Sequence, residues 1–299
     1  QRLSVMLNVD CFLEYLRGEL NRSQMTVESY REDLAHFEEF ARNLSDSFSW
    51  ETVDSDTVRL WMENMMDKGN AATTVNRRLS ALRTFYRFAL SRKYIETDPV
   101  CHVKGPKKKK PLPQFLKEGE MDELLGGLST EGDFKYVRAR TIIMALYETG
   151  IRLSELRGLN EEDVNFRTHE IKVTGKGNKQ RIIPFGGELD KTLGEYLQKK
   201  SESVKVKTSA LICSTTGSRL SASQIRRIVK EYLSMVSSLK KRSPHVLRHT
   251  FATAMLNHEA EIESVKKLLG HAKLSTTEIY THTTFEQLKR VYNKAHPRA

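Results

Sequence analysis

Apolar residues recur at three- and four-residue intervals along most of the chain, a period that predicts a mainly α-helical protein. The fourth predicted helix carries an apolar stripe that we expect to face a core: Leu79, Leu82, Phe85, Tyr86 and Ala89. The helices expected before residue 240 cover residues 9–44 (with a break near 21–23), 55–68, 72–91, 117–126, 134–148, 189–200 and 223–237.

Three short segments interrupt the helical pattern and predict a small antiparallel β-sheet. They read DVNF, EIKV and QRIIPF and lie between residues 163 and 185. The last two flank TGKGNK, whose glycines and asparagine favour a hairpin with Lys176 near its tip. Because this loop lacks the spacing and the Ser or Thr of a P-loop, the sequence disfavours a nucleotide site there.

The segment that starts at residue 243 combines helix signals with cationic side chains. Ser243 and Pro244 are typical of an N-cap followed by the first helical residue. His245 and Arg248 lie three positions apart, so their side chains are neighbours and form a cationic group suited to phosphate. One face of this helix is expected to enter the core through Leu247, Phe251, Ala254 and Met255.

Two more polar side chains follow within the next thirty residues. A helix over 261–269 is expected to stop at Gly270, which places His271 just past the helix end. Ser275 and Glu278 match a capping box, and the short helix that they open carries Tyr280.

These motifs resemble the signature boxes of a known family. HVLRHTFATAML, LLGHAKLSTTEIYTH and TGIRLSEL are similar to those of the tyrosine recombinases, the lambda-integrase superfamily, and above all to Xer-type site-specific recombinases. The resemblance extends from about Met6 to the C-terminal PRA. It implies a two-domain DNA clamp, mainly α with a small antiparallel β-sheet. The expected parts are a helical core-binding (SAM-like) domain at 6–100, a basic linker at 101–114 and a catalytic domain at 115–299.

The resemblance also implies cleavage and religation of DNA through a 3′-phosphotyrosyl intermediate. Tyr280 is the expected nucleophile, and His245 can accept its proton. Lys176, rather than Lys179, matches the family's hairpin lysine and is the best acid for the 5′-oxygen. Without a metal or other cofactor, the charge of the phosphate can be held by Arg152, Arg248 and His271. Glu155 is a candidate brace for Arg152.

Charge supports a nucleic-acid partner, since 49 Lys and Arg against 38 Asp and Glu leave a net charge of +11. On the helix over 72–91, candidates for phosphate contacts are Arg77, Arg78, Arg83 and Arg87. A solvated basic face is the alternative interpretation of these arginines. The proline-rich linker adds Lys107, Lys108, Lys109 and Lys110. These lysines either follow the DNA backbone or belong to a solvated tether, and their place between two domains favours DNA.

The Xer resemblance implies a homo- or heterotetramer of recombinases on two DNA sites, which exchanges strands through a Holliday junction to resolve chromosome dimers. An accessory DNA translocase is a possible further partner. A final helix capped by Thr284 and Gln287 carries an apolar stripe of Leu288, Val291 and Tyr292. That stripe can close its own domain or, as the resemblance implies, dock in trans.

Other functions are less consistent with the sequence. A mobile-element integrase would use the same residues and remains an alternative function. A type IB topoisomerase fits the whole chain less well. A catalytically silent DNA-binding relative is disfavoured because all six expected catalytic side chains are present. A zinc site at His245 and His249 is disfavoured because HVLRH lacks the glutamate of HExxH.

The remaining sequence features concern the compartment. Cys11, Cys101 and Cys213 fit neither a disulfide framework nor a zinc site, and no apolar run reaches the roughly 20 residues of a membrane span. We therefore expect a cytoplasmic, nucleoid-associated protein with no membrane partner. Because Gln1 is not an initiator, Met6 is a candidate for the natural start. The sequence does not specify the target DNA or the need for a second recombinase.

Overall fold

The computed structural model describes residues 7–108, 114–128, 133–236, 239, 242–270 and 282–299, and gives only the backbone of residues 176 and 282–284. The chain divides into two compact units, Gln1–Pro111 and Leu112–Ala299. Most described residues are helical and one small sheet is present, which confirms the predicted fold class. None of the described helices is both long and apolar enough to cross a bilayer.

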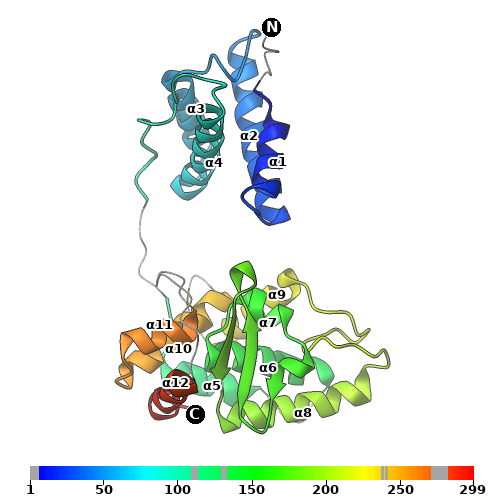
Figure 1. The fold of residues 1–299 in the computed structure, drawn as a ribbon. Coiled ribbons are helices and arrows are strands. Elements are labelled where there is room, and N and C mark those ends of the chain that lie inside the picture. Colours follow the sequence, from blue (N-terminus) through cyan, green and yellow to red (C-terminus); the bar gives the residue numbers. More distant parts are fainter. Residues whose placement is uncertain (1–6, 109–113, 129–132, 237–238, 240–241, 271–281) are drawn as a thin grey trace. The chain divides into compact units, whose positions relative to one another are not determined.

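The first unit is a helical bundle made of α1 (Val9–Gly18), α2 (Gln24–Leu44), α3 (Ser55–Asp67) and α4 (Ala72–Ser91) (Figure 1). Side-chain oxygens that accept a hydrogen bond from the first turn precede the first three helices, at Asn8, Ser23 and Asp54. In the core, Phe12 packs edge-on against Phe85 with ring centres 5.4 Å apart. The whole predicted stripe of α4 is buried, as expected.

The second unit contains a three-stranded antiparallel sheet together with eight described helices, and side chains of one face of the sheet are buried (Figure 1). The strands β1 (Val164–Asn165), β2 (Glu170–Thr174) and β3 (Gln180–Pro184) pair in chain order, with Ile171 opposite Ile183. A tight turn that contains Lys176–Asn178 joins β2 to β3, which pair in antiparallel fashion, so the predicted hairpin is confirmed. The helices are α5 (Glu118–Gly127), α6 (Phe134–Thr149), α7 (Leu153–Gly158), α8 (Gly187–Ser203), α9 (Ala222–Val236), α10 (Pro244–Asn257), α11 (Ile262–Leu269) and α12 (His282–Ala295).

Helix α6 is the central element of the second unit. It packs against both α8 and α10, and every residue from Thr141 to Thr149 is buried, as in a helix with core on all sides. The helix ends at Gly150, whose φ of 59° is left-handed. A Cβ at Gly150 would lie 2.5 Å from Cδ1 of Phe251, so only glycine fits this turn. The turn fixes the direction in which the chain continues to Arg152.

The two predicted helix starts agree with the structure to different degrees. Ser243 is the N-cap of α10 and Pro244 is its first residue, as predicted, although the Ser243 side chain makes no capping hydrogen bond. The amide of Val246, which such a side chain would bind, donates instead to the carbonyl oxygen of Ser243 at 2.9 Å. Helix α12 begins at His282, two residues before the predicted cap at Thr284. A capping pattern favours a helix start without stopping the helix from extending further towards the N-terminus.

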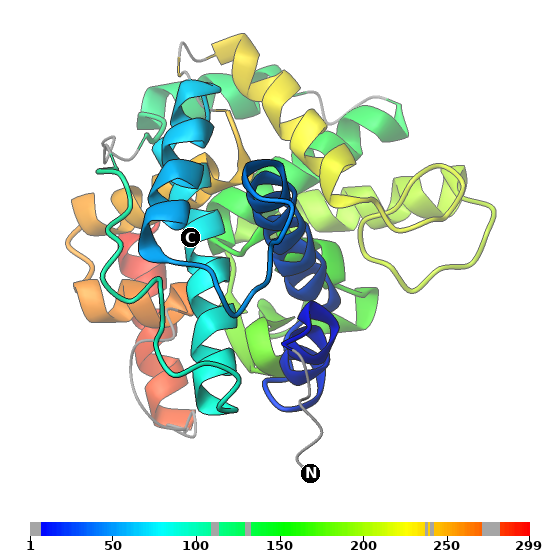
Figure 2. The same ribbon diagram turned by 90° about the horizontal axis from the view of Figure 1, so that it is seen from above.

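The C-terminal helix packs within its own unit. Figures 1 and 2 show α12 (red) beside α10 and α11 (orange), and all three helices are in contact. Leu288 and Tyr292 are buried in a cluster with Phe251 and Leu268, and Val291 packs partly against it. In this single chain the stripe is therefore covered within its own unit, and its docking in trans stays a prediction. The apolar faces of α10 and α11 need a cover, and α12 of the same chain supplies it.

Candidate active site

Arg152 lies directly before α7, where the turn at Gly150 places it. Its Nη1 donates to Oε1 of Glu155 at 2.9 Å, and its Nη2 donates to the carbonyl oxygen of Gly270 at 3.1 Å. Its backbone amide also donates to Oε2 of Glu155 at 2.7 Å. Glu155 therefore braces Arg152 in the structure, as the sequence suggested. About a third of the Arg152 side chain, 36%, stays accessible to solvent.

Arg248 comes from α10 and is almost fully buried. Its Nη1 donates to the carbonyl oxygen of Gly150 at 2.5 Å, and its Nη2 donates to that of Leu269 at 2.7 Å. Burial lowers the pKa of Arg248, and the positive charge of Arg152 lowers it further, to about 10. The side chain is still cationic at neutral pH. The structure thus brings Arg152 and Arg248 together, although they lie about a hundred residues apart in the sequence.

The end of α11 anchors three guanidinium groups. Arg181, Arg248 and Arg152 donate to the consecutive carbonyl oxygens of Leu268, Leu269 and Gly270. These carbonyls lie at the negative end of the helix, which attracts cations. Gly270 ends α11 with a φ of 63°, as predicted from its glycine. We call this group, Arg152, Arg181 and Arg248 with the three carbonyls, the arginine cap.

Arg181 is a residue of this group that the sequence reasoning missed. It lies on β3, is only 8% exposed, and binds Glu155 with both Nη atoms. A signal for it was present: in QRIIP, strict alternation places Arg181 on the same face as the buried Ile183. A buried arginine needs a buried acceptor, and that requirement points to an acid such as Glu155.

His245 lies at the start of α10, close to the arginine cap. The pKa of its imidazole is lowered, first by partial desolvation and then by the positive charges of His249, Arg248 and Arg226. The neutral imidazole that results is the form that can accept a proton.

Three predicted catalytic side chains lie outside the described part of the chain. His271 and Tyr280 lie outside the described residues, as does the predicted capping box at Ser275 and Glu278. For Lys176 only the backbone is described, in the turn between β2 and β3. In that turn Gly177 and Asn178 both have left-handed backbones, with φ of 74° and 59°.

Residues 114–287 match the Phage integrase family, and residues 9–93 match the phage integrase N-terminal SAM-like domain. The first of these matches alone covers more than half of the chain. The chain belongs to the phage integrase family. It is a tyrosine recombinase, an enzyme that cleaves and rejoins DNA.

Two relatives of this integrase-family chain are both named tyrosine recombinase XerC. Tyrosine recombinase XerC of Pelotomaculum thermopropionicum is 41% identical, over 98% of this chain and 99% of the relative. Tyrosine recombinase XerC of Listeria innocua is 38% identical, over 96% of this chain and 97% of the relative. Two solved structures show the same fold. XerH recombinase bound to difH DNA matches with a TM-score of 0.71 and 23% identity, over 94% and 82% of the two chains. Tn1549 transposon integrase with transposon right-end DNA matches with a TM-score of 0.72 and 18% identity, over 96% and 99%.

The arginines of α4 are largely engaged within the first unit of this recombinase. Arg77 pairs with Asp33 and donates to Ser29, and Arg78 lies 3.8 Å from Asp33. Arg83 donates to the carbonyl oxygen of Val103. Arg77 nevertheless keeps half of its side chain exposed, and Arg87 is exposed. Their contacts with DNA stay a prediction.

The start of the linker packs on α4. Asn76 donates to the carbonyl oxygen of Pro106 at 2.8 Å, and a Cβ at Gly105 would collide with Asn76 Oδ1. Beyond this point Lys107 and Lys108 are exposed, whereas Lys109 and Lys110 lie outside the described residues. The linker lysines are thus available for a polyanion where the structure describes them.

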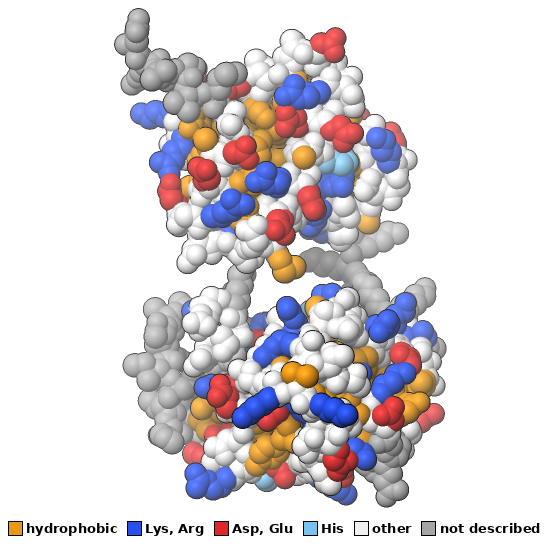
Figure 3. Space-filling view, turned by 90° about the vertical axis from the view of Figure 1, so that its right-hand side faces the viewer, with side chains coloured by type: hydrophobic (Ala, Val, Ile, Leu, Met, Phe, Trp, Pro, Cys, Tyr) orange, Lys and Arg blue, Asp and Glu red, His pale blue; other side chains and the backbone are white. Residues whose placement is uncertain are grey.

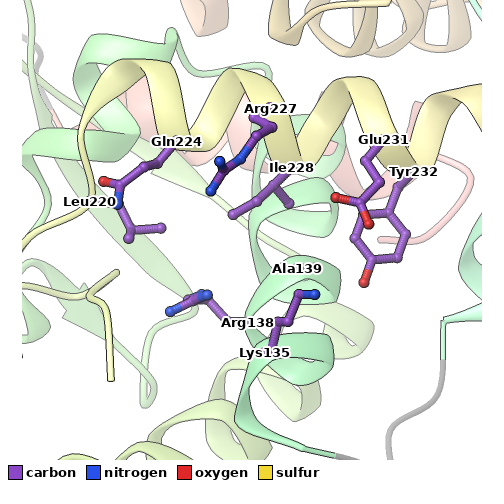
Figure 4. A pocket seen from close by; sticks show the side chains of 9 residues that line it. All are labelled: Lys135, Arg138, Ala139, Leu220, Gln224, Arg227, Ile228, Glu231 and Tyr232. Carbon is purple, nitrogen blue, oxygen red and sulfur yellow. The ribbon is translucent and has the colours of Figure 1, made fainter. Parts of the chain in front are cut away.

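On the face that Figure 3 shows, basic and acidic side chains are interspersed on both units. Figure 4 shows a hollow of about 170 Å³, where Gln224, Arg227 and Glu231 of α9 face Lys135 and Arg138 of α6. No residue of the arginine cap lines it. A DNA duplex is read from an open surface, so a hollow of this size does not mark the reaction site.

Proposed function

We propose that this tyrosine recombinase is of the Xer type and recombines DNA at specific sites, in the resolution of chromosome dimers rather than the movement of a mobile element. The names of the full-length relatives support the Xer assignment. The observation that carries the chemistry is the pair Arg152 and Arg248, each held by two acceptors in one cationic group. Such a preorganised pair suits the charge that develops on a phosphate in the transition state.

In the proposed reaction, Oη of Tyr280 attacks the scissile phosphorus and the bond from phosphorus to the 5′-oxygen breaks. The products are a 3′-phosphotyrosyl link and a free 5′-hydroxyl. The tyrosine proton passes to His245, whose lowered pKa keeps it neutral at physiological pH. Lys176 gives a proton to the leaving oxygen, while Arg152, Arg248 and His271 stabilise the charge on the non-bridging oxygens. Attack by a 5′-hydroxyl of another duplex reverses these steps and needs no ATP.

The two units take separate parts in this proposal. Residues 6–100 form the core-binding domain, residues 101–114 a basic linker and residues 115–299 the catalytic domain. Two pairs of recombinases act on two sites through a Holliday junction, in the cytoplasm beside the nucleoid. The overlap of the two family matches with these segments supports the division.

A substrate with a better leaving group tests the role of Lys176. A 5′-bridging phosphorothiolate leaves as a thiolate, which needs little protonation. Lys176→Ala should therefore slow cleavage of ordinary DNA by roughly 10²–10⁴ and recover most of that loss on the phosphorothiolate. Arg152→Ala and Arg248→Ala should not recover comparably, because their charge acts on other oxygens. The measurement is the single-turnover rate of covalent adduct formation, and equal recovery of all three variants would refute the assignment.

A further inference from the structure

Arg181 connects three parts of the second unit through one side chain. Its Nη1 and Nη2 bind Oε1 and Oε2 of Glu155 at 2.8 and 2.9 Å, and its Nε donates to the carbonyl oxygen of Leu268 at 3.1 Å. The pair is shielded from water, with 8% of the Arg181 side chain and 1% of the Glu155 side chain exposed. A buried guanidinium that donates from all three of its nitrogens is geometrically specific.

The carboxylate that Arg181 holds is the one that holds Arg152. Oε1 of Glu155 accepts from both guanidinium groups, at 2.8 Å from Arg181 and 2.9 Å from Arg152. Burial alone would raise the pKa of Glu155, but hydrogen bonds from Arg181 and Arg152 bring it down to about 2. Glu155 is therefore ionised, and the two hydrogen bonds from Arg181 fix the position of its carboxylate.

The surrounding backbone is built closely around this pair. A Cβ at Gly270 would lie 3.0 Å from Cζ of Arg181, and a Cβ at Gly175 would lie 3.3 Å from Oε1 of Glu155. Gly270 ends α11 directly before His271, and Gly175 precedes Lys176 at the end of β2. The two chain segments that lead to these predicted catalytic residues thus both pass against the Arg181–Glu155 pair.

We infer that Arg181 is a positioning residue of the recombination reaction, which sets Arg152 through Glu155 and fixes the end of α11 through Leu268. This inference rests on the proposed function and assigns a role to a side chain outside the six predicted catalytic residues. Arg181 touches no reacting atom in this scheme. Its loss acts on the rate by displacing Arg152, and a displacement of about 1 Å can cost on the order of 10² in rate.

The test uses a substrate that needs less positive charge. In a methylphosphonate, a methyl group replaces one non-bridging oxygen at the scissile position, so the linkage is neutral and depends less on Arg152. Arg181→Lys keeps a positive charge but loses the fork. This substitution should slow adduct formation on ordinary DNA roughly ten- to hundredfold, and it should slow adduct formation on the methylphosphonate much less. The Kd of the variant for uncleaved DNA should stay within about twofold of wild type. Arg152→Ala should show the same substrate dependence.

Arg219→Lys is the matched control. Arg219 also donates to backbone carbonyl oxygens, those of Arg157 and Leu159, but lies outside the arginine cap. Its substitution should change neither rate by more than about twofold, since it disturbs packing without displacing Arg152. If Arg181→Lys lowers the rate of adduct formation by the same factor on both substrates, or leaves the rate on ordinary DNA unchanged, Arg181 is not a positioning residue.

A second variant keeps the inference testable if Arg181→Lys does not give a cooperative melt. Gly175→Ala adds a methyl group 3.3 Å from Oε1 of Glu155 at a φ of −98°, which alanine tolerates. It should show the same preferential loss on ordinary DNA with a smaller factor, and equal losses on both substrates would refute the inference. A wild-type protein that forms no adduct with either substrate would instead contradict the proposed function itself.

Discussion

At the scale of single residues, the protonation of His245 determines how the reaction should depend on pH. The pKa of His245 is lowered from its usual 6.5, so the neutral base persists to lower pH than an ordinary histidine. The midpoint of the acid limb for adduct formation by wild type should therefore lie below pH 6.5. His245→Gln should lose this acid limb and react roughly 10²–10⁴ more slowly. A single-turnover rate profile checks this, and an acid limb centred above pH 6.5 would contradict the assigned base.

The predicted catalytic residues differ in how far the sequence could predict their surroundings. Gly150 and Gly270 predict left-handed helix ends, so the positions of Arg152 and of the end of α11 follow from the local sequence pattern. The brace by Glu155, three residues after Arg152, is also local. The link from Arg181 to Glu155 spans 26 residues and that to Leu268 spans 87, so it depends on how strand and helix pack. Local pattern contains no such information.

At the scale of elements, the contact of α12 with α6 contains a buried acid. Oε2 of Glu148 accepts hydrogen bonds from the backbone amide of Gly186 at 3.2 Å and from the hydroxyl of Tyr292 at 3.5 Å. Burial raises its pKa to about 8. Since the folded state then binds more protons than the unfolded state between about pH 4.5 and 8, this carboxyl makes the free energy of unfolding fall as pH rises through that range.

Glu148→Gln should therefore stabilise the protein at pH 8, by roughly 1–3 kcal/mol, with little effect near pH 4.5. The measurement is denaturant unfolding of the second unit at pH 5, 6.5 and 8. Glu123→Gln, at an exposed position of α5, is the control and should leave the wild-type pH dependence unchanged. A Glu148→Gln protein whose unfolding free energy follows that of wild type at every pH would show that the carboxyl is not held neutral.

The elements themselves were well predicted because their signals are periodic and local. The bounds of α4 were predicted to the residue, and α1, α2, α3, α6, α9 and the hairpin agree within about one or two residues. The surface that α12 covers could not be predicted from such local signals. Its stripe of Leu288, Val291 and Tyr292 is equally suited to any apolar partner. Only packing shows that α10 and α11 of the same chain cover it.

At the scale of the whole molecule, the linker lysines should contribute to DNA affinity by neutralising phosphates. Each neutralised phosphate releases counterions, so the slope of log affinity against log salt should be about −0.9 per phosphate. Lys107→Gln with Lys108→Gln should flatten that slope by about 0.9 for each phosphate that these lysines neutralise, and should weaken all sequences alike. Lys205→Gln with Lys207→Gln, at exposed lysines between α8 and α9, is the control. If the slope of log affinity against log salt is equal for the two double variants, the linker lysines do not contact DNA and the linker is a solvated tether.

The central claim is that DNA becomes covalently linked to Tyr280. The direct measurement is a denaturing gel after incubation with a suicide substrate, in which a nick lets the short 5′-hydroxyl strand diffuse away. Wild type should give a shifted protein–DNA band with a chelator present, because the proposed chemistry uses arginine and histidine in place of a metal. Tyr280→Phe removes only the hydroxyl oxygen, so it should bind the DNA with unchanged Kd and give no band. A covalent band in the Tyr280→Phe protein, or a wild-type band that disappears with the chelator, would contradict the account.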